Sequence, residues 1–201
     1  MRKLRAMLTN RIALARAVPI LFLSACASAQ GDSFSAAAYF PPTEFHDVEA
    51  PDASVPAAWA EYLSAFDEPS FIRDRSLKFA VRLTIAPSSQ GGVVIRISKK
   101  KDGTIVGVKK EIVIGTTMPV TSSFPAVPSD LTTIKKALER ENFWRSGNRQ
   151  SIATSDGQSW LIEVSDQQGF HAVYSDGPAK GAVRSIGRLL MTIAQTNAGK
   201  R

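Results

Sequence analysis

The sequence predicts a single α+β domain in which an antiparallel sheet of about five strands carries two to three helices packed on one face. Two observations support this fold class. Stretches of period-two alternation follow one another without a helical pattern between them, and amphipathic helical patterns flank them. Strands joined only by turns pair antiparallel, because a parallel connection needs a crossover of about a dozen residues or more. A length of 201 residues fits one such domain with appended segments.

The domain is expected to begin with a helix followed by a three-stranded meander. Trp59, Leu63 and Phe66 recur at helical spacing and predict a short helix over residues 57–66. Three stretches of alternating apolar and polar residues follow, and Asp102-Gly103 supplies the turn before the last of them. These stretches are residues 77–85, 93–98 and 104–114.

The second half of the domain is expected to be a helix, a hairpin and a closing helix. Three prolines make residues 115–128 an irregular connection. Ser129 is then predicted as the N-cap of a helix over 130–142. The hairpin turns at Asp166-Gln167-Gln168-Gly169, and the closing helix is predicted over 181–195. The hairpin and the three-stranded meander together give the sheet of about five strands.

The first 25 residues are predicted to be an export signal outside the fold. Five basic and no acidic residues accompany a short apolar run, Ala17-Val18-Pro19-Ile20-Leu21-Phe22-Leu23. Seven residues cannot cross a hydrocarbon core of ~30 Å, which needs ~20 residues, so a removable signal is favoured over a permanent span. Met1 and Met7 are both candidate starts.

Two cleavage sites overlap behind this run. Leu23-Ser24-Ala25-Cys26 resembles the lipobox of bacterial lipoproteins, which implies cleavage before Cys26 and a lipid on its thiol. Ala27-Ser28-Ala29, before Gln30, instead fits soluble export to the periplasm or medium. Cys26 is the only cysteine, and lipidation explains an unpaired cysteine in an exported protein. We therefore expect membrane attachment through Cys26. Because Ala27 is not the Asp that typically retains a lipoprotein in the inner membrane, the resemblance implies the outer membrane, facing the periplasm.

Residues 26–56 are predicted to be a flexible tether, lipid-attached or free. They are rich in Ala, Ser, Pro and Asp, and their prolines disfavour helix and strand interiors. A flexible coil of that length reaches roughly 30 Å. The α+β domain is then expected over 57–197, with a frayed tail over 198–201.

Removal of the signal changes the charge argument. The whole chain carries a net charge of +7 from 25 basic and 18 acidic residues, whereas the chain without residues 1–25 keeps 20 basic and 18 acidic residues, or +2. This balance does not indicate a nucleic-acid partner. Two basic clusters remain, Lys99-Lys100-Lys101 and Lys109-Lys110, and we expect them at a solvated hairpin tip rather than at a phosphate site.

The second hairpin and its approach resemble a pattern in a group of small uncharacterised bacterial exported proteins. The residues that carry the resemblance are Phe143-Trp144, then Asp156-Gly157-x-x-Trp160-x-x-Glu163, then Gly169-Phe170-His171-x-Val173. The resemblance extends over roughly residues 57–195. It implies a fold and an exported location, and no reaction.

Candidate catalytic residues are confined to the same hairpin. A Ser-His-Asp arrangement would use Ser159, His171 and Asp176, general acid–base chemistry would pair Glu163 with His171, and a metal site would add Asp156. None of these sets has a diagnostic spacing. We therefore expect no catalytic residue, no cofactor and no metal, and keep His171, Glu163 and Asp156 as candidates.

The register of the hairpin decides between a structural and a catalytic His171. If the loop is 166–169, Val164 pairs with His171, which then shares the core face with Trp160 while Glu163 points to the opposite face. A three-residue loop shifts the parity and brings Glu163 and His171 together. We expect the first register and a structural histidine.

The sequence therefore predicts a lipid-anchored envelope protein with a binding or structural role, and favours a non-catalytic one. The expected partners are the membrane and an envelope protein. One alternative is a periplasmic inhibitor or immunity-type protein that contacts an enzyme through 115–128 or 99–101. The other alternative is a hydrolase that uses His171.

Overall fold

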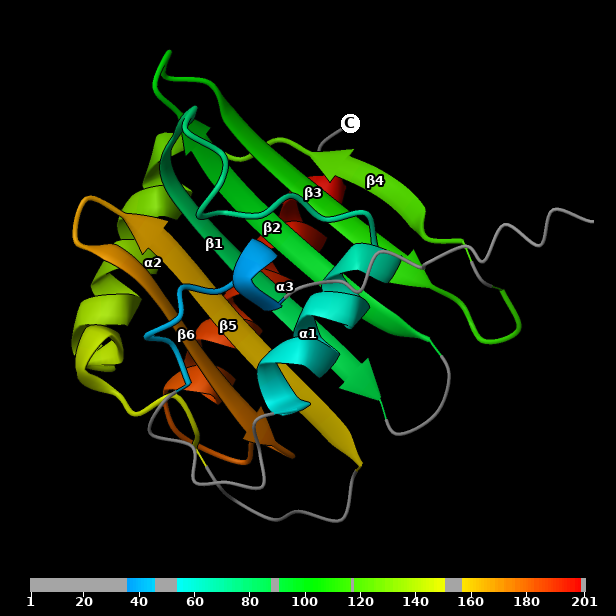
Figure 1. The fold of residues 1–201 in the computed structure, drawn as a ribbon. Helices are drawn as coiled ribbons and strands as arrows, with labels where there is room; N and C mark the ends of the chain where they lie inside the picture. Colours follow the sequence, from blue (N-terminus) through cyan, green and yellow to red (C-terminus); the bar gives the residue numbers. More distant parts are fainter. Residues whose placement is uncertain (1–35, 46–53, 88–90, 117, 151–156, 200–201) are drawn as a thin grey trace, which may run out of the picture. The chain divides into compact units, whose positions relative to one another are not determined.

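The computed structural model describes residues 36–45, 54–87, 91–116, 118–150 and 157–199, all within one compact unit, Ser33–Arg201. In these residues one antiparallel sheet of six strands packs with three α-helices, which confirms the α+β class with one strand more than expected (Figure 1). The predicted export signal, Cys26 and the candidate Asp156 lie outside the described residues.

The sheet combines the predicted meander with the predicted hairpin. Its strand order is β4-β3-β2-β1-β5-β6, and every neighbouring pair is antiparallel. The hairpin joins the free side of β1, so β1 and β5 lie inside the sheet and are buried along most of their length. The strands are β1 (Leu77–Pro87), β2 (Gly92–Lys100), β3 (Ile105–Ile112), β4 (Val120–Phe124), β5 (Gln158–Asp166) and β6 (Gly169–Asp176).

Strand β4 corrects the prediction that 115–128 is irregular throughout. It lies between two prolines and pairs with β3, where Gly107 is opposite Phe124. The ring of Phe124 occupies the space above Gly107, so a side chain at Gly107 would collide with it. Phe124 is the one buried residue of the strand, and a single inward residue gives no alternation that the sequence could display.

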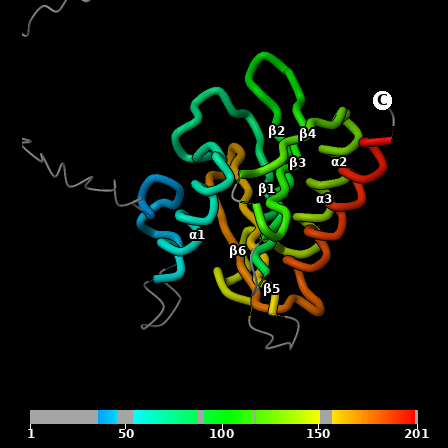
Figure 2. The backbone as a smooth tube through the Cα atoms, turned by 90° about the vertical axis from the view of Figure 1, so that its right-hand side faces the viewer, coloured from blue at the N-terminus to red at the C-terminus, as the bar shows by residue number. Residues whose placement is uncertain are grey.

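Helices α2 (Pro128–Arg140) and α3 (Ala182–Ala198) cover one face of the sheet, as predicted (Figure 2). Helix α2 begins one residue before the predicted cap Ser129, because Pro128 fits the first helical position. The capping residue is Val127, whose backbone N–H donates to Asp130 Oδ2 at 2.9 Å. Apolar residues of both helices pack on Val81, Leu83, Ile97, Ile162 and neighbouring residues.

The opposite face is covered by helix α1 (Ser54–Ala65) and the 3-10 helix η1 (Ala36–Ala38), which differs from the expected helices on a single face (Figures 1 and 2). The expected tether also differs, since residues 36–45 pack on the domain through buried Phe40 and Phe45. Apolar residues on this face, such as Leu161 and Tyr174, require cover. Helix α1 begins at Ser54, before the predicted start at 57. Pro56 is tolerated there because it lies in the first turn, where a backbone N–H would have no helical acceptor.

Candidate functional site

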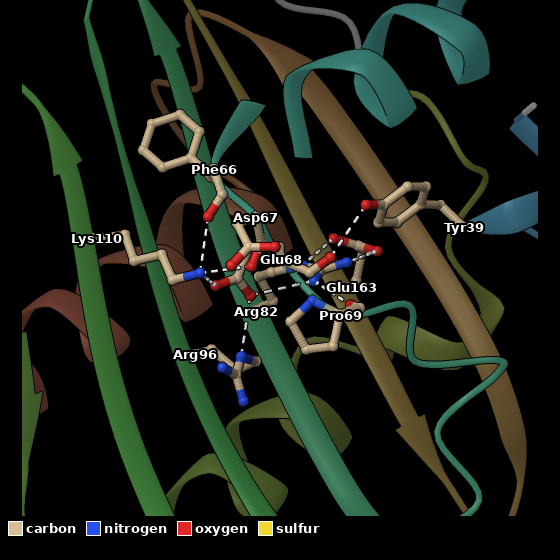
Figure 3. A network of polar contacts seen from close by, with 9 residues as sticks. All are labelled: Tyr39, Phe66, Asp67, Glu68, Pro69, Arg82, Arg96, Lys110 and Glu163. Atoms are coloured by element: carbon tan, nitrogen blue, oxygen red, sulfur yellow. Dashed lines mark hydrogen bonds and ion pairs between the residues drawn. The ribbon is translucent and has the colours of Figure 1, made fainter. Parts of the chain in front are cut away.

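A cluster of charged side chains is buried on the sheet face beneath α1 and the loop that follows it (Figure 3). At its centre, Arg82 of β1 faces Glu163 of β5, its cross-strand partner. The guanidinium holds the carboxylate with two bonds, from Nε to Oε2 at 2.7 Å and from Nη2 to Oε1 at 2.7 Å. Both side chains are fully buried. This bidentate geometry is the strongest form of charge-assisted hydrogen bond between side chains.

Glu68, from the loop after α1, extends the cluster across three strands. Its Oε2 accepts from Arg82 Nη1 at 3.2 Å and from Arg96 Nε on β2 at 2.9 Å. Its Oε1 lies 3.2 Å from Lys110 Nζ on β3. One buried carboxylate therefore connects cations of β1, β2 and β3, and fixes the loop on the sheet (Figure 3).

The same cations bind the backbone where α1 ends. Lys110 Nζ donates to the carbonyl oxygens of Phe66 at 2.7 Å and Asp67 at 2.6 Å, and Arg82 Nη1 donates to that of Pro69 at 2.8 Å. These carbonyls lie beyond Ala65, the last residue of the helix, so the helix supplies no N–H for them, and the cations satisfy them instead. The expectation of a solvated Lys109-Lys110 cluster is therefore wrong for Lys110, which is 8% exposed.

The electrostatics of the central pair follow from burial and proximity. Burial disfavours the charge on Arg82, but Glu163 and Glu68 outweigh that effect and raise the pKa of the guanidinium. Burial raises the pKa of Glu163, and the adjacent Arg82 acts against that rise. Because both oxygens of Glu163 accept from Arg82, this candidate holds Arg82 in place and lies on the sheet face opposite His171.

His171 lies in the expected register, with Val164 opposite it and the loop at 166–169. Its ring packs edge-on against Phe143, with ring centroids 5.2 Å apart, and stacks with Trp144 at 6.3 Å. The ring is therefore held in an aromatic surrounding at the edge of the core, with 15% of the side chain exposed.

Both ring nitrogens of His171 have partners. Nδ1 lies 2.9 Å from Glu44 Oε1, and Nε2 lies 2.9 Å from the carbonyl oxygen of Ser146. A carboxylate and a carbonyl both accept, so the imidazolium form, which donates from both nitrogens, satisfies both contacts. The carboxylate beside His171 is therefore Glu44, and not the Glu163 that the acid–base pairing requires.

Glu44 also closes the exposed edge of β6. Its Oε1 accepts from the backbone N–H of Ala172 at 2.7 Å and from Asn148 Nδ2 at 2.5 Å. Asn148 Nδ2 is also 2.8 Å from the carbonyl oxygen of Ala172. An edge strand has unpaired backbone groups that can bind other chains. Here Glu44 and Asn148 bind the N–H and the carbonyl oxygen of Ala172 instead. Sequence reasoning missed Glu44, because it lies in the expected tether, 128 positions from Ala172.

The remaining candidates do not come together around His171. Ser159 Oγ donates to Asp176 Oδ1 at 2.6 Å, and the two residues are cross-strand partners on the Glu163 face. His171 points to the other face, so the Ser-His-Asp arrangement does not form. Within the described parts of the chain, no group of three or more His, Cys, Asp or Glu residues is close enough to hold a metal ion.

A pocket of about 300 Å³ opens between the first turns of α1 and the ends of β1, β5 and β6. Its walls are aromatic, and its floor is the cross-strand row of Ala86, Ser159 and Asp176. Arg149 and Asp176 are exposed and place opposite charges at its rim. The aromatic walls are Trp59, Tyr62 and Tyr174.

Comparisons with known proteins give no family for this chain. No protein-family model matches the sequence, and no curated protein matches it. Among the described helices, none has the length and apolar character needed to cross a bilayer.

Proposed function

We propose that the protein is an exported, lipid-anchored protein of the bacterial envelope whose domain binds a small molecule in the pocket beside α1. The observation that supports the binding role is the pocket itself. It combines aromatic walls with a carboxylate and a guanidinium at one rim, and ligand sites are typically apolar cavities with a few convergent polar groups. Its volume of about 300 Å³ lies at the small end of the usual range of ~300–1,000 Å³.

Small side chains keep this pocket open. Further along α1, Ala60 and Leu63 are fully buried against the sheet. At the pocket the helix instead presents Ala58, and the sheet presents Ala86 and Ser159. Larger apolar residues at these positions would fill the space and bury more surface. The domain is therefore less stable with the small residues than it would be with a filled pocket.

The binding role is tested by blocking the pocket from the exposed position Ala58. Native mass spectrometry of the protein purified from membranes is expected to show a bound small molecule in the wild type and none in Ala58→Phe. Ala57→Phe is the matched control, because Ala57 is also exposed on α1 but does not line the pocket. A wild-type protein that carries no small molecule, or an Ala58→Phe protein that keeps it, would contradict the binding role.

The proposed anchor rests on Leu23-Ser24-Ala25-Cys26 and on the resemblance to exported proteins. We expect Cys26→Ser to abolish palmitate labelling and to move the protein from the membrane fraction to the soluble periplasm, because the thiol that carries the lipid is gone. Labelling and fractionation of the wild type and the variant measure this. An unlabelled wild type whose mature chain begins at Gln30 would exclude the lipid anchor.

A second candidate function, an inhibitor-type role through a protein contact, is favoured by the hairpin between β3 and β4. Ile114 and Met118 are 74% and 75% exposed, and Val113 and Val120 are 52% and 63% exposed. The chain has no charged residue from 112 to 129, so these exposed apolar side chains have no charged neighbours along the hairpin. It overlaps the contact that the sequence predicts over 115–128.

The protein contact is tested by crosslinking in membranes. If this hairpin binds an enzyme, Ile114→Asp is expected to remove the crosslinked partner, whereas Lys101→Ala at the other hairpin tip is expected to keep it. The reverse pattern would move the contact to residues 99–101, and an unchanged partner in both variants would exclude both tips.

A further inference from the structure

We propose that the ligand of this pocket is an α-amino acid with an apolar side chain, held by its ammonium and carboxylate groups at the rim. This inference rests on the proposed binding role and specifies the chemical class of the ligand. Three features of the pocket carry it: the oriented carboxylate of Asp176, the guanidinium of Arg149 and the uncharged aromatic walls.

Asp176 supplies the site for the ammonium group. Its Oδ1 accepts from Ser159 Oγ at 2.6 Å, and this bond orients the carboxylate on the last cross-strand row of the pocket floor. An ionised carboxylate has about four lone-pair sites, so it can accept further donors beside the Ser159 hydroxyl. An ammonium group offers three donors and the opposite charge.

Arg149 supplies the site for the carboxylate group. Its guanidinium carbon lies 5.9 Å from the ring centroid of Tyr174, so the cation stands beside an aromatic wall of the pocket that both residues line. A guanidinium has five N–H donors in a planar fork and therefore holds a carboxylate in addition to other partners.

The two charges together select a zwitterion. A ligand with a net positive charge is attracted by Asp176 and repelled by Arg149. A ligand with a net negative charge is attracted by Arg149 and repelled by Asp176. A ligand that carries both charges on one carbon is complementary to both groups, and complementarity of this kind gives specificity.

The interior of the pocket selects an apolar side chain. The hydroxyl of Tyr62 is engaged with the backbone, 2.8 Å from the carbonyl oxygen of Gly91, so this wall presents its ring. The phenol of Tyr62 is uncharged at neutral pH, and burial raises its pKa further, to about 12. Val55 and Ala86 complete an apolar lining, and the space of about 300 Å³ suits a single amino acid better than a polymer.

The ligand class is tested with probes that each lack one part of the amino acid. Isothermal titration of the full chain, purified in detergent, is expected to show binding of L-phenylalanine and L-leucine. The affinity of 3-phenylpropionate, which lacks the ammonium, and of 2-phenylethylamine, which lacks the carboxylate, is expected to be lower by about tenfold or more. Glycine, which lacks the side chain, is expected not to bind measurably.

Two substitutions assign the two charges. Asp176→Asn is expected to weaken L-phenylalanine binding by about tenfold or more, but not to weaken the binding of 3-phenylpropionate, whose carboxylate Asp176 repels. Arg149→Gln is expected to weaken L-phenylalanine binding similarly, but not to weaken the binding of 2-phenylethylamine, whose ammonium group Arg149 repels. Arg145→Gln is the matched control, an exposed arginine outside the pocket, and is expected to bind like the wild type.

The outcomes that overturn this proposal differ from those that overturn the binding role. If 3-phenylpropionate or 2-phenylethylamine binds as tightly as L-phenylalanine, the zwitterionic ligand is wrong. If Ala58→Phe still binds L-phenylalanine, the amino acid occupies another site and the proposal is wrong. A third outcome is that no apolar amino acid binds, while native mass spectrometry detects another molecule that is absent from Ala58→Phe. The proposed ligand class is then wrong, and the binding role of the pocket is retained.

Discussion

Arg82→Met is expected to lower the free energy of unfolding by about 3–5 kcal/mol, because it leaves Glu163 buried without its cation and removes one of the cations that bind the buried Glu68. The methionine keeps most of the apolar stem but loses the guanidinium, whose carbon lies 4.3 Å from the ring centroid of Phe71. The loss is therefore mainly electrostatic. Since domains are stable by only ~5–15 kcal/mol, urea denaturation at neutral pH should show a clearly lowered midpoint.

Two further variants separate the buried pair from a general effect of losing an arginine. Arg75→Met removes an exposed arginine seven positions earlier and is expected to leave the urea midpoint nearly unchanged. The double variant Arg82→Met/Glu163→Leu removes both members of the bidentate pair, and is expected to be more stable than Arg82→Met alone. A single variant as stable as the wild type, or a double variant less stable than the single one, would contradict the assigned role of the pair.

The fold could be predicted from the sequence because local periodicity indicates the main strands and helices. The alternation over 77–85 and 93–98, and the helical spacing of the apolar residues in α2 and α3, each depend on neighbouring residues alone. The hairpin register also followed from one local feature, the turn at 166–169. What local patterns do not contain is which face of the sheet a helix covers, and this explains the placement of α1.

The buried charge cluster could not be predicted, because a strand with one polar face looks the same whether that face meets water or another layer of protein. Arg82 and Thr84 alternate with apolar residues as on a half-exposed strand, yet both are fully buried. Their cover comes from α1, the loop after it and residues 36–45, distant in sequence. Glu68 does stand at the end of a predicted helix, but only the folded chain brings it to Lys110 on β3.

Trp160→Ala is expected to destabilise the domain by about 3–5 kcal/mol, because truncation of a buried aromatic residue leaves a large cavity. Trp160 is 4% exposed on the face that α3 covers. Its ring fits so closely against Gly187 that a Cβ added there would lie 2.7 Å from the indole. The guanidinium carbon of Arg184, also on α3, lies 5.2 Å from the ring centroid. Thermal and urea unfolding measure the loss, with Trp144→Ala, a partly buried tryptophan outside the strands, as the matched control.

His171→Gln is the comparison that separates packing from chemistry on the same sheet face. Glutamine loses the ring contacts with Phe143 and Trp144, and its single amide nitrogen cannot take the places of both ring nitrogens. We therefore expect a loss of about 1–3 kcal/mol, smaller than for Trp160→Ala. The pocket lies on the other face, so ligand binding by the folded variant is expected to match the wild type. A His171→Gln protein with an unchanged melting temperature but no function in the native strain would overturn the structural role of His171 and favour the catalytic one.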